Sequence, residues 1–375
     1  MGVERVKTLK AVQNSSLIKL FAGLTALIFV AVAVLNFWKL TAPEAAKPPP
    51  VLTKAQDYSA SYKPPAPRAV KPKLEPELES DATGLPKLPR DKAEAWLAKR
   101  NRNAASLLAV FRARGDTNYL HEAATNFPND PQVQLAVLSR NAFPGDRRKW
   151  LDLFLASSPS NSLADYFSAG EYFKNGKTVE AVRELLAASG KDQFQTYSLE
   201  TLLNGEELYS DSGISSREAS IHAMADMAEE NLPQLADFKV IAQGIGEAMK
   251  QEPASVSDLA QLGLDFSGKI NSGDSGKFLI NQMVGTAIEK NLLSQLEQNT
   301  AYDFLDGQTP AQVAEAIKQQ KIELRKLMTD FAPAQLQMMM SESETAIYMQ
   351  RMKIYGELDA MKWVIQQHPP ADTQK

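Results

Sequence analysis

The sequence predicts an all-α protein in which a single N-terminal transmembrane helix and a Pro-rich linker precede paired helices and then a helical bundle. Three observations predict this class. Residues 20–38 form an apolar run without a charge, and eleven of the 21 prolines fall between Pro43 and Pro89. From Asp91 onward, apolar residues recur mostly every three or four positions, which is the spacing of one face of an α-helix. No convincing alternation of apolar and polar residues predicts a strand.

Composition and charge exclude several classes of function. The 375 residues include no cysteine, so disulfides, thiol catalysis, zinc–thiolate sites and iron–sulfur clusters are excluded. Hydrophobic content is 44%, which is ordinary for a globular protein, so only the one apolar run suggests a membrane. Residues 1–90 carry a net charge of +6 and the remainder −10. An acidic body is a poor partner for nucleic acid.

The apolar run at 20–38 has the length of a membrane span. At about 1.5 Å per residue it nearly matches a hydrocarbon core of roughly 30 Å, and Lys19 and Lys39 flank it. It is longer than the usual apolar region of a signal peptide, and no clean Ala-x-Ala follows, so an uncleaved lipid-contacting anchor is favoured over a cleaved signal. The residues that typify the anchor are Leu20, Phe29, Leu35 and Trp38.

The segments on either side of the span predict its orientation and its reach. Residues 1–19 are a short basic tail, which favours a cytoplasmic N-terminus and a body outside the cytoplasm, periplasmic if the cell is bacterial. Residues 39–90 are the Pro-rich segment. Because proline lacks the amide proton and fixes φ, neither helix nor sheet can propagate there, and we expect a disordered linker that acts as a spacer. A ligand for a proline-binding domain is the alternative.

A fixed period appears in the first half of the body, over 91–205. Gly115, Gly145 and Gly176 are 30 and 31 residues apart, and Pro128 and Pro159, which fall between them, are 31 apart. Each unit would consist of a helix, a tight glycine turn, a second helix and a turn marked by proline. Because a short helix pair cannot bury its apolar face alone, such pairs stack on one another.

The best unit, 164–188, resembles a tetratricopeptide repeat. The residues on that family's aromatic, glycine, acidic, small, large and small positions are Tyr172, Gly176, Glu180, Ala181, Leu185 and Ala188. The unit departs from the family at Ala169, where glycine is usual, and its period is shorter than about 34 residues. The resemblance covers about 101–190 and implies a scaffold that binds peptides or proteins.

The second half of the body, 206–366, is predicted to be a helical domain, and 367–375 a disordered tail. Ser215 and Glu218 form a capping box at a helix start. Pro233 and Pro333 are each expected in the first turn of a new helix. Residues 191–215, which contain Asn204-Gly205, are interpreted as a degenerate pair or a boundary.

No catalytic, cofactor or metal site is predicted. Residues 273–276, Gly-Asp-Ser-Gly, are interpreted as a turn at a helix start and not as a protease nucleophile, because nothing around them fits that site. The three histidines are scattered. Seven of the 12 methionines lie between Met328 and Met361, where they could pack a core, form an adaptable protein-binding surface or bind Cu(I).

These observations predict a non-enzymatic function. We expect a single-pass membrane-anchored helical scaffold or assembly factor that binds other proteins in the cell envelope. The alternative is a membrane-tethered enzyme or ligand-binding helical domain whose site lies in 216–366.

Overall fold

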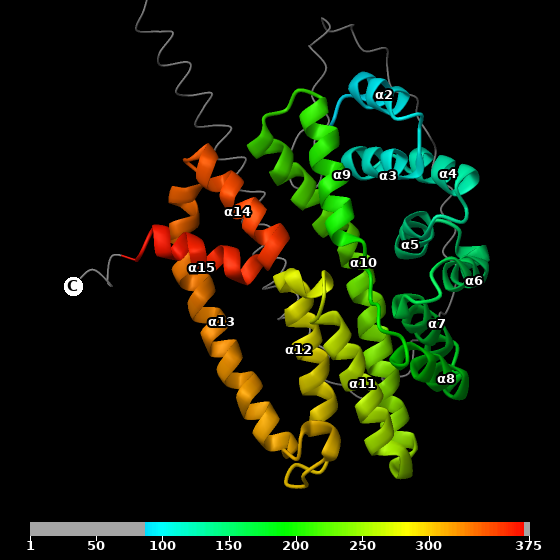
Figure 1. Ribbon diagram of the computed structural model, residues 1–375. Coiled ribbons are helices and arrows are strands. Elements are labelled where there is room, and N and C mark those ends of the chain that lie inside the picture. Colours follow the sequence, from blue (N-terminus) through cyan, green and yellow to red (C-terminus); the bar gives the residue numbers. More distant parts are fainter. Residues whose placement is uncertain (1–86, 371–375) are drawn as a thin grey trace, which may run out of the picture.

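The computed structural model describes residues 87–370, and every regular element in that range is helical (Figure 1). The expected basic tail, the membrane span at 20–38 and most of the linker lie outside the described residues. Within 87–370, no helix combines the length and the apolarity that crossing a bilayer requires. The elements are α2 (Arg90–Lys99), α3 (Ala104–Arg114), α4 (Thr117–Asn126), α5 (Pro131–Arg140), η1 (Pro144–Asp146), α6 (Arg147–Ser157), α7 (Ser162–Lys174), α8 (Thr178–Ser189), α9 (Ser198–Asp211), α10 (Ser216–Gln251), η2 (Pro253–Ser255), α11 (Val256–Ile270), η3 (Ser275–Lys277), α12 (Leu279–Leu293), η4 (Asp303–Leu305), α13 (Pro310–Met338), α14 (Glu342–Tyr355) and α15 (Glu357–Gln367).

Short polar side chains set the starts of many helices. Asn103 and Asp130 accept hydrogen bonds from backbone N–H groups in the first turns of α3 and α5. Ser215 accepts from the Glu218 N–H at α10, but the Glu218 side chain accepts from the Ser215 hydroxyl, so only half of the predicted capping box forms. Thr309 and Gln312 form a reciprocal capping box at α13. These caps satisfy N–H groups that have no partner within the helix.

The helices of the N-terminal half are packed in pairs, and one long helix joins them to the rest. Helix α3 packs on α4, α5 on α6 and α7 on α8. Helices α3, α5 and α7 also pack on α10, which contacts α9, α11, α12 and α14 as well. Figure 1 shows α10 running between the pairs on one side and α12 to α15 on the other. The buried apolar residues form one continuous cluster from α2 to α15.

An aromatic cluster fixes α7 and α11 against α10. The rings of Tyr166 and Phe266 lie 4.4 Å apart, and Phe238 contacts Phe266 edge-on at 5.5 Å. Phe167 and Phe194 complete the cluster around Phe238. Aromatic pairs at these distances add about 0.5–1.5 kcal/mol each beyond the burial of their area, so this crossing is strongly held.

Two prolines lie inside helices, where the sequence predicted helix starts. Helix α10 continues through Pro233, and α13 continues through Pro333. The prediction was wrong because a proline φ near −65° is helical. The lost N–H donor and the clash of the ring with the carbonyl four residues earlier cost about 3 kcal/mol, which packing against other helices can offset. Gln234 and Leu235, directly after Pro233, are buried. Packing of these residues against other helices therefore stabilises α10 despite the hydrogen bond lost at Pro233.

Helix α9 forms where the sequence suggested a degenerate pair or a boundary. Gly205 lies inside this helix, so the expected division between 205 and 206 falls within one element. A Cβ at Gly205 would stand 2.9 Å from the Ala223 Cβ of α10. The glycine therefore serves the close approach of two helices and not a turn.

Candidate functional site

The glycines that were expected to define the repeats lie between paired helices. Gly115 has φ +65° where α3 ends, and Gly176 has φ +68° between α7 and α8. Both positions need the left-handed conformation that glycine adopts without cost. Gly145 lies in η1 between α5 and α6, has no positive φ, and has open space where a Cβ would stand. The structure therefore requires glycine at two of the three turns.

The other residues of the best unit lie on α7 and α8. Ala181 and Leu185 are fully buried on α8. Tyr172 on α7 is half-buried, and the Arg148 guanidinium lies 5.2 Å from the centre of its ring. A small and a large apolar residue thus occupy the buried side of α8, as the spacing predicts.

Two carboxylates of α10 bind the helix pairs that pack along it. Glu230 Oε2 lies 3.1 Å from Arg140 Nη2, and Glu230 Oε1 lies 3.8 Å from Arg112 Nη2. Asp237 accepts a hydrogen bond from Lys174 Nζ at 2.8 Å and pairs with Arg147 at 3.4 Å. The sides of α3, α5 and α7 that face α10 are therefore filled by the chain itself and are closed to a partner.

A cavity of about 110 Å³ lies between α10, α12, α13, α14 and α15. Seven methionines line it: Met224, Met227, Met328, Met338, Met339, Met349 and Met361. Three aromatic rings also line it, those of Phe278, Phe331 and Tyr348. Most of the Met-rich segment noted in the sequence therefore faces this interior, whereas Met340 is 79% exposed.

Few polar groups line this cavity. Asn231 is 5% exposed; its Oδ1 accepts a hydrogen bond from Ser198, whereas its Nδ2 is buried without a partner. Glu357, the first residue of α15, accepts a hydrogen bond from the Leu279 N–H at 2.9 Å, where α12 begins. Burial raises the pKa of Glu357, against the lowering effect of that bond. Burial, and then the charge of Glu357, raises the pKa of Tyr348 well above its usual range.

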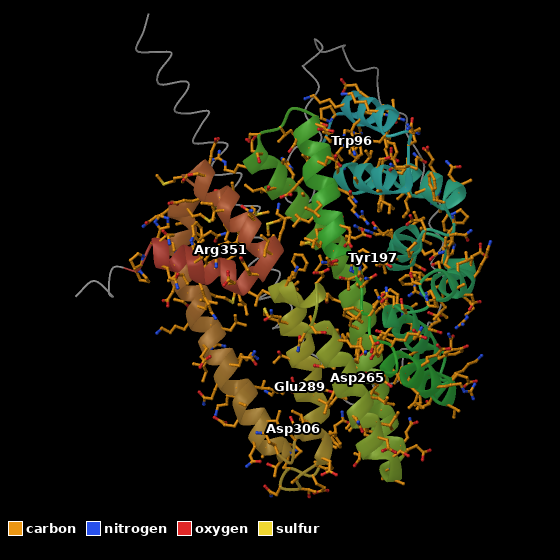
Figure 2. The ribbon with its side chains drawn as sticks, viewed as in Figure 1. Trp96, Tyr197, Asp265, Glu289, Asp306 and Arg351 are labelled. Atoms are coloured by element: carbon orange, nitrogen blue, oxygen red, sulfur yellow. The ribbon has the colours of Figure 1, made fainter. Side chains whose placement is uncertain are left out.

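A turn with a required glycine positions Glu357. Gly356 joins α14 to α15 with φ +95°, and a Cβ there would lie 3.3 Å from the Lys277 backbone. The Lys277 side chain donates to the Lys353 carbonyl at 3.1 Å. Arg351 pairs with Asp359 across the same turn, and Figure 2 shows its side chain beside α14 and α15. These contacts hold the carboxylate against the start of α12.

The remaining sequence motifs occupy structural positions. Ser275 of the Gly-Asp-Ser-Gly segment is buried in η3, where Asn281 Nδ2 contacts its Oγ at 3.2 Å. The His121 ring makes a tilted contact with Phe143, His222 stacks on Tyr209, and His368 pairs with Glu344. Within 87–370, no group of three or more His, Asp or Glu side chains could hold a metal ion.

The cavity is the feature that sequence reasoning missed. Met224 and Met227 of α10 are about a hundred residues from the Met-rich segment, and Glu357 shows no motif of its own. The only signal in the sequence was the Met-rich segment. The sequence did not decide whether its methionines pack a core, bind a protein or bind Cu(I). In comparisons with protein-family models, with curated proteins and with solved structures, nothing matches this chain.

Proposed function

We propose that this chain is a single-pass membrane-anchored scaffold or assembly factor that binds other proteins in the cell envelope. Residues 20–38 anchor it in the lipid, the segment 39–90 spaces the body from the bilayer, and α3 to α8 act as tetratricopeptide-like repeats. The observation that carries the proposal is the exposed apolar surface on α13 and α14.

That surface collects most of the exposed apolar side chains of the body. Among residues 87–370 ten large apolar side chains are exposed, and six of them lie on α13, on α14 or in the turn between these helices: Ile322, Leu336, Met340, Ile347, Ile354 and Tyr355. Ile347 and Ile354 are seven residues apart and therefore lie on the same side of α14. Because α13, α14 and the turn between them carry more exposed apolar side chains than any other part of the described body, we infer that a partner binds there.

The number of exposed apolar side chains favours α13 and α14 over the repeats as the binding surface, because only two large apolar side chains of α3 to α8, Val179 and Leu186, are exposed. Because α10 fills the sides of α3, α5 and α7 that face it, a partner would have to displace a 36-residue helix to reach them. The exposed side of α14 needs no such rearrangement. The proposed scaffold therefore uses its helix pairs as support and its α13–α14 surface for contact.

Site-specific crosslinking in the membrane-bound full chain tests this proposal. A photoreactive amino acid at Ile354, 52% exposed, should give a discrete crosslinked protein, and Ile347→Asp should weaken that product. The matched control places the same group at Lys318, an exposed polar position on α13. Identical products from the two positions, or a product at Ile354 that is insensitive to Ile347→Asp, would contradict the proposal.

The alternative is a ligand-binding helical domain within 216–366. The cavity between α10 and α12 to α15 favours this second candidate, because its walls lie entirely within that range. The enzymatic form of the alternative has no comparable observation in its favour.

A further inference from the structure

The cavity holds an acidic group that lacks a cation. Glu357 is the only carboxylate among the residues that line it, and no lysine or arginine lines it. Among the described residues no ion pair reaches Glu357. Three nearby cations bind other acids: Lys277 pairs with Asp274 at 2.8 Å, Lys353 with Glu206 at 2.7 Å, and Arg351 with Asp359. A fourth, Arg217, donates to the Met339 carbonyl at 3.3 Å.

An apolar interior normally avoids such a group. Removing a carboxylate from water is costly unless hydrogen bonds or a cation compensate for the lost hydration. Here the Leu279 N–H and the positive end of α12 supply part of the compensation. Glu357 is half-buried and no cation of the described chain offsets its charge, while Asn231 Nδ2 on the same wall is buried without a partner. The cavity therefore offers a ligand two polar contacts.

The rest of the wall suits an organic cation. Phe278, Phe331 and Tyr348 bring three aromatic rings to the cavity, and aromatic faces attract cations. The methionine thioethers are polarizable and can adapt to a branched apolar body. An apolar cavity of about 150 Å³ holds benzene, so one of about 110 Å³ accepts a smaller molecule.

We propose that this cavity is a binding site for a small alkylammonium ion. The charged nitrogen faces the Glu357 carboxylate, and the alkyl body lies among the methionines and the three rings. This inference goes beyond the proposed scaffold function and does not depend on it, because the cavity lies inside the helical body and the crosslinking surface lies outside.

Two probes of equal size separate a cation site from a merely apolar cavity. The probes are isopropylammonium and isopropanol, which are smaller than benzene and differ mainly in the charged group. The readout is the NMR signal of ¹³C-labelled methionine methyl groups in the full chain. Met224, Met328 and Met349 report on the cavity, whereas exposed Met340 and buried Met249 lie outside its walls and serve as references.

We expect isopropylammonium to shift the cavity methyl signals saturably at concentrations about tenfold lower than isopropanol requires, because charge-assisted contacts are the stronger ones. The reference signals should not move. Equal affinity for the two probes would show an apolar cavity only and would overturn the proposal. So would the absence of any shift at the cavity methionines.

The variant Glu357→Gln isolates the carboxylate. Its amide oxygen can still accept the Leu279 N–H, so α12 keeps its cap while the charge is removed. We expect the variant to bind both probes with equal, weak affinity. A variant that kept the preference for the cation would overturn the assignment of Glu357, and the wild-type comparison decides the proposal even if the variant fails to fold.

Discussion

Glu230 is a buried carboxylate, 3% exposed, placed between arginines from two different helix pairs. Burial lowers the pKa of Arg112, and the charge of Glu230 acts in the opposite direction. Removing one partner of such a group leaves an uncompensated charge in the interior. We therefore predict that Glu230→Gln lowers the free energy of unfolding by about 3–5 kcal/mol.

The neighbouring glutamate provides the control for this prediction. Glu229 pairs with Arg140 at 3.4 Å, but its side chain is exposed, so Glu229→Gln should cost at most about 1 kcal/mol. Urea denaturation of the two variants measures the difference. Equal losses would mean that the Glu230 cluster is no more than a surface ion pair.

Glu289 on α12, labelled in Figure 2, is a half-buried carboxyl whose pKa is raised by burial alone. The folded state then binds its proton more tightly than the unfolded state, so stability from this group is present at low pH and is lost as pH rises through the folded pKa. We predict that Glu289→Gln changes the melting temperature little at pH 4 and raises it at pH 7.

Glu315 gives the opposite sign and serves as the comparison. A hydrogen bond from Gln319, and then Lys318, lower its pKa, so the stability it contributes is present at neutral pH and is lost on acidification. Glu315→Gln should not raise the melting temperature at pH 7. Equal effects of Glu289→Gln at pH 4 and pH 7 would show that its ionisation does not oppose folding.

At the scale of the element, Ala181 tests how α8 packs. Ala181 is fully buried on α8, whereas Glu180 beside it is half-buried. Ala181→Glu forces extra volume and an unpaired charge into the interior, which should cost several kcal/mol. Glu180→Ala should change the melting temperature little. If the two variants melt alike, α8 does not bury the side that its repeat pattern predicts.

The sequence predicted most helices of the body but not their lengths. Periodicity and caps such as Ser215 and Thr309 locate helix starts because both signals are local. Pro233 and Pro333 were wrongly predicted to start helices, because the neighbouring sequence of a proline in the first turn does not differ from that of a proline inside a helix. Only packing against other helices distinguishes the two cases. Gly205 was interpreted as part of a boundary for a related reason. Its small size allows the close approach of α10 to α9, which the local sequence does not show.

At the scale of the whole molecule, the candidate site could be predicted only in part. The Met-rich segment drew attention to 328–361, and Met338 and Met339 do pack inward. The cavity also needs Met224 from α10 and Phe278 before α12, whose proximity depends on tertiary contacts alone. The pairing of Glu357 with Leu279 is equally remote in sequence, so no spacing of residues could have indicated it.

The membrane anchor remains a prediction of the sequence, and fractionation tests it. Because residues 20–38 are long enough to cross the bilayer and lack a cleavage signal, the mature protein should sediment with membranes, resist carbonate extraction and retain its original N-terminus. Deleting 20–38 should release the body into the soluble fraction. A soluble mature chain that begins near residue 46 would show that the segment is a cleaved signal.

The place of α10 also governs the order in which the body can form. Open repeat arrays fold from neighbour to neighbour, because each unit contacts only the next. Here α3, α5 and α7 complete their burial only against a helix that ends at Gln251. During synthesis, more than a hundred residues therefore emerge after α3 before its partner is complete. Until α10 has been synthesised, the side of each pair that it covers stays exposed to water. A chaperone that covers this side until α10 has formed would raise the yield of the native protein.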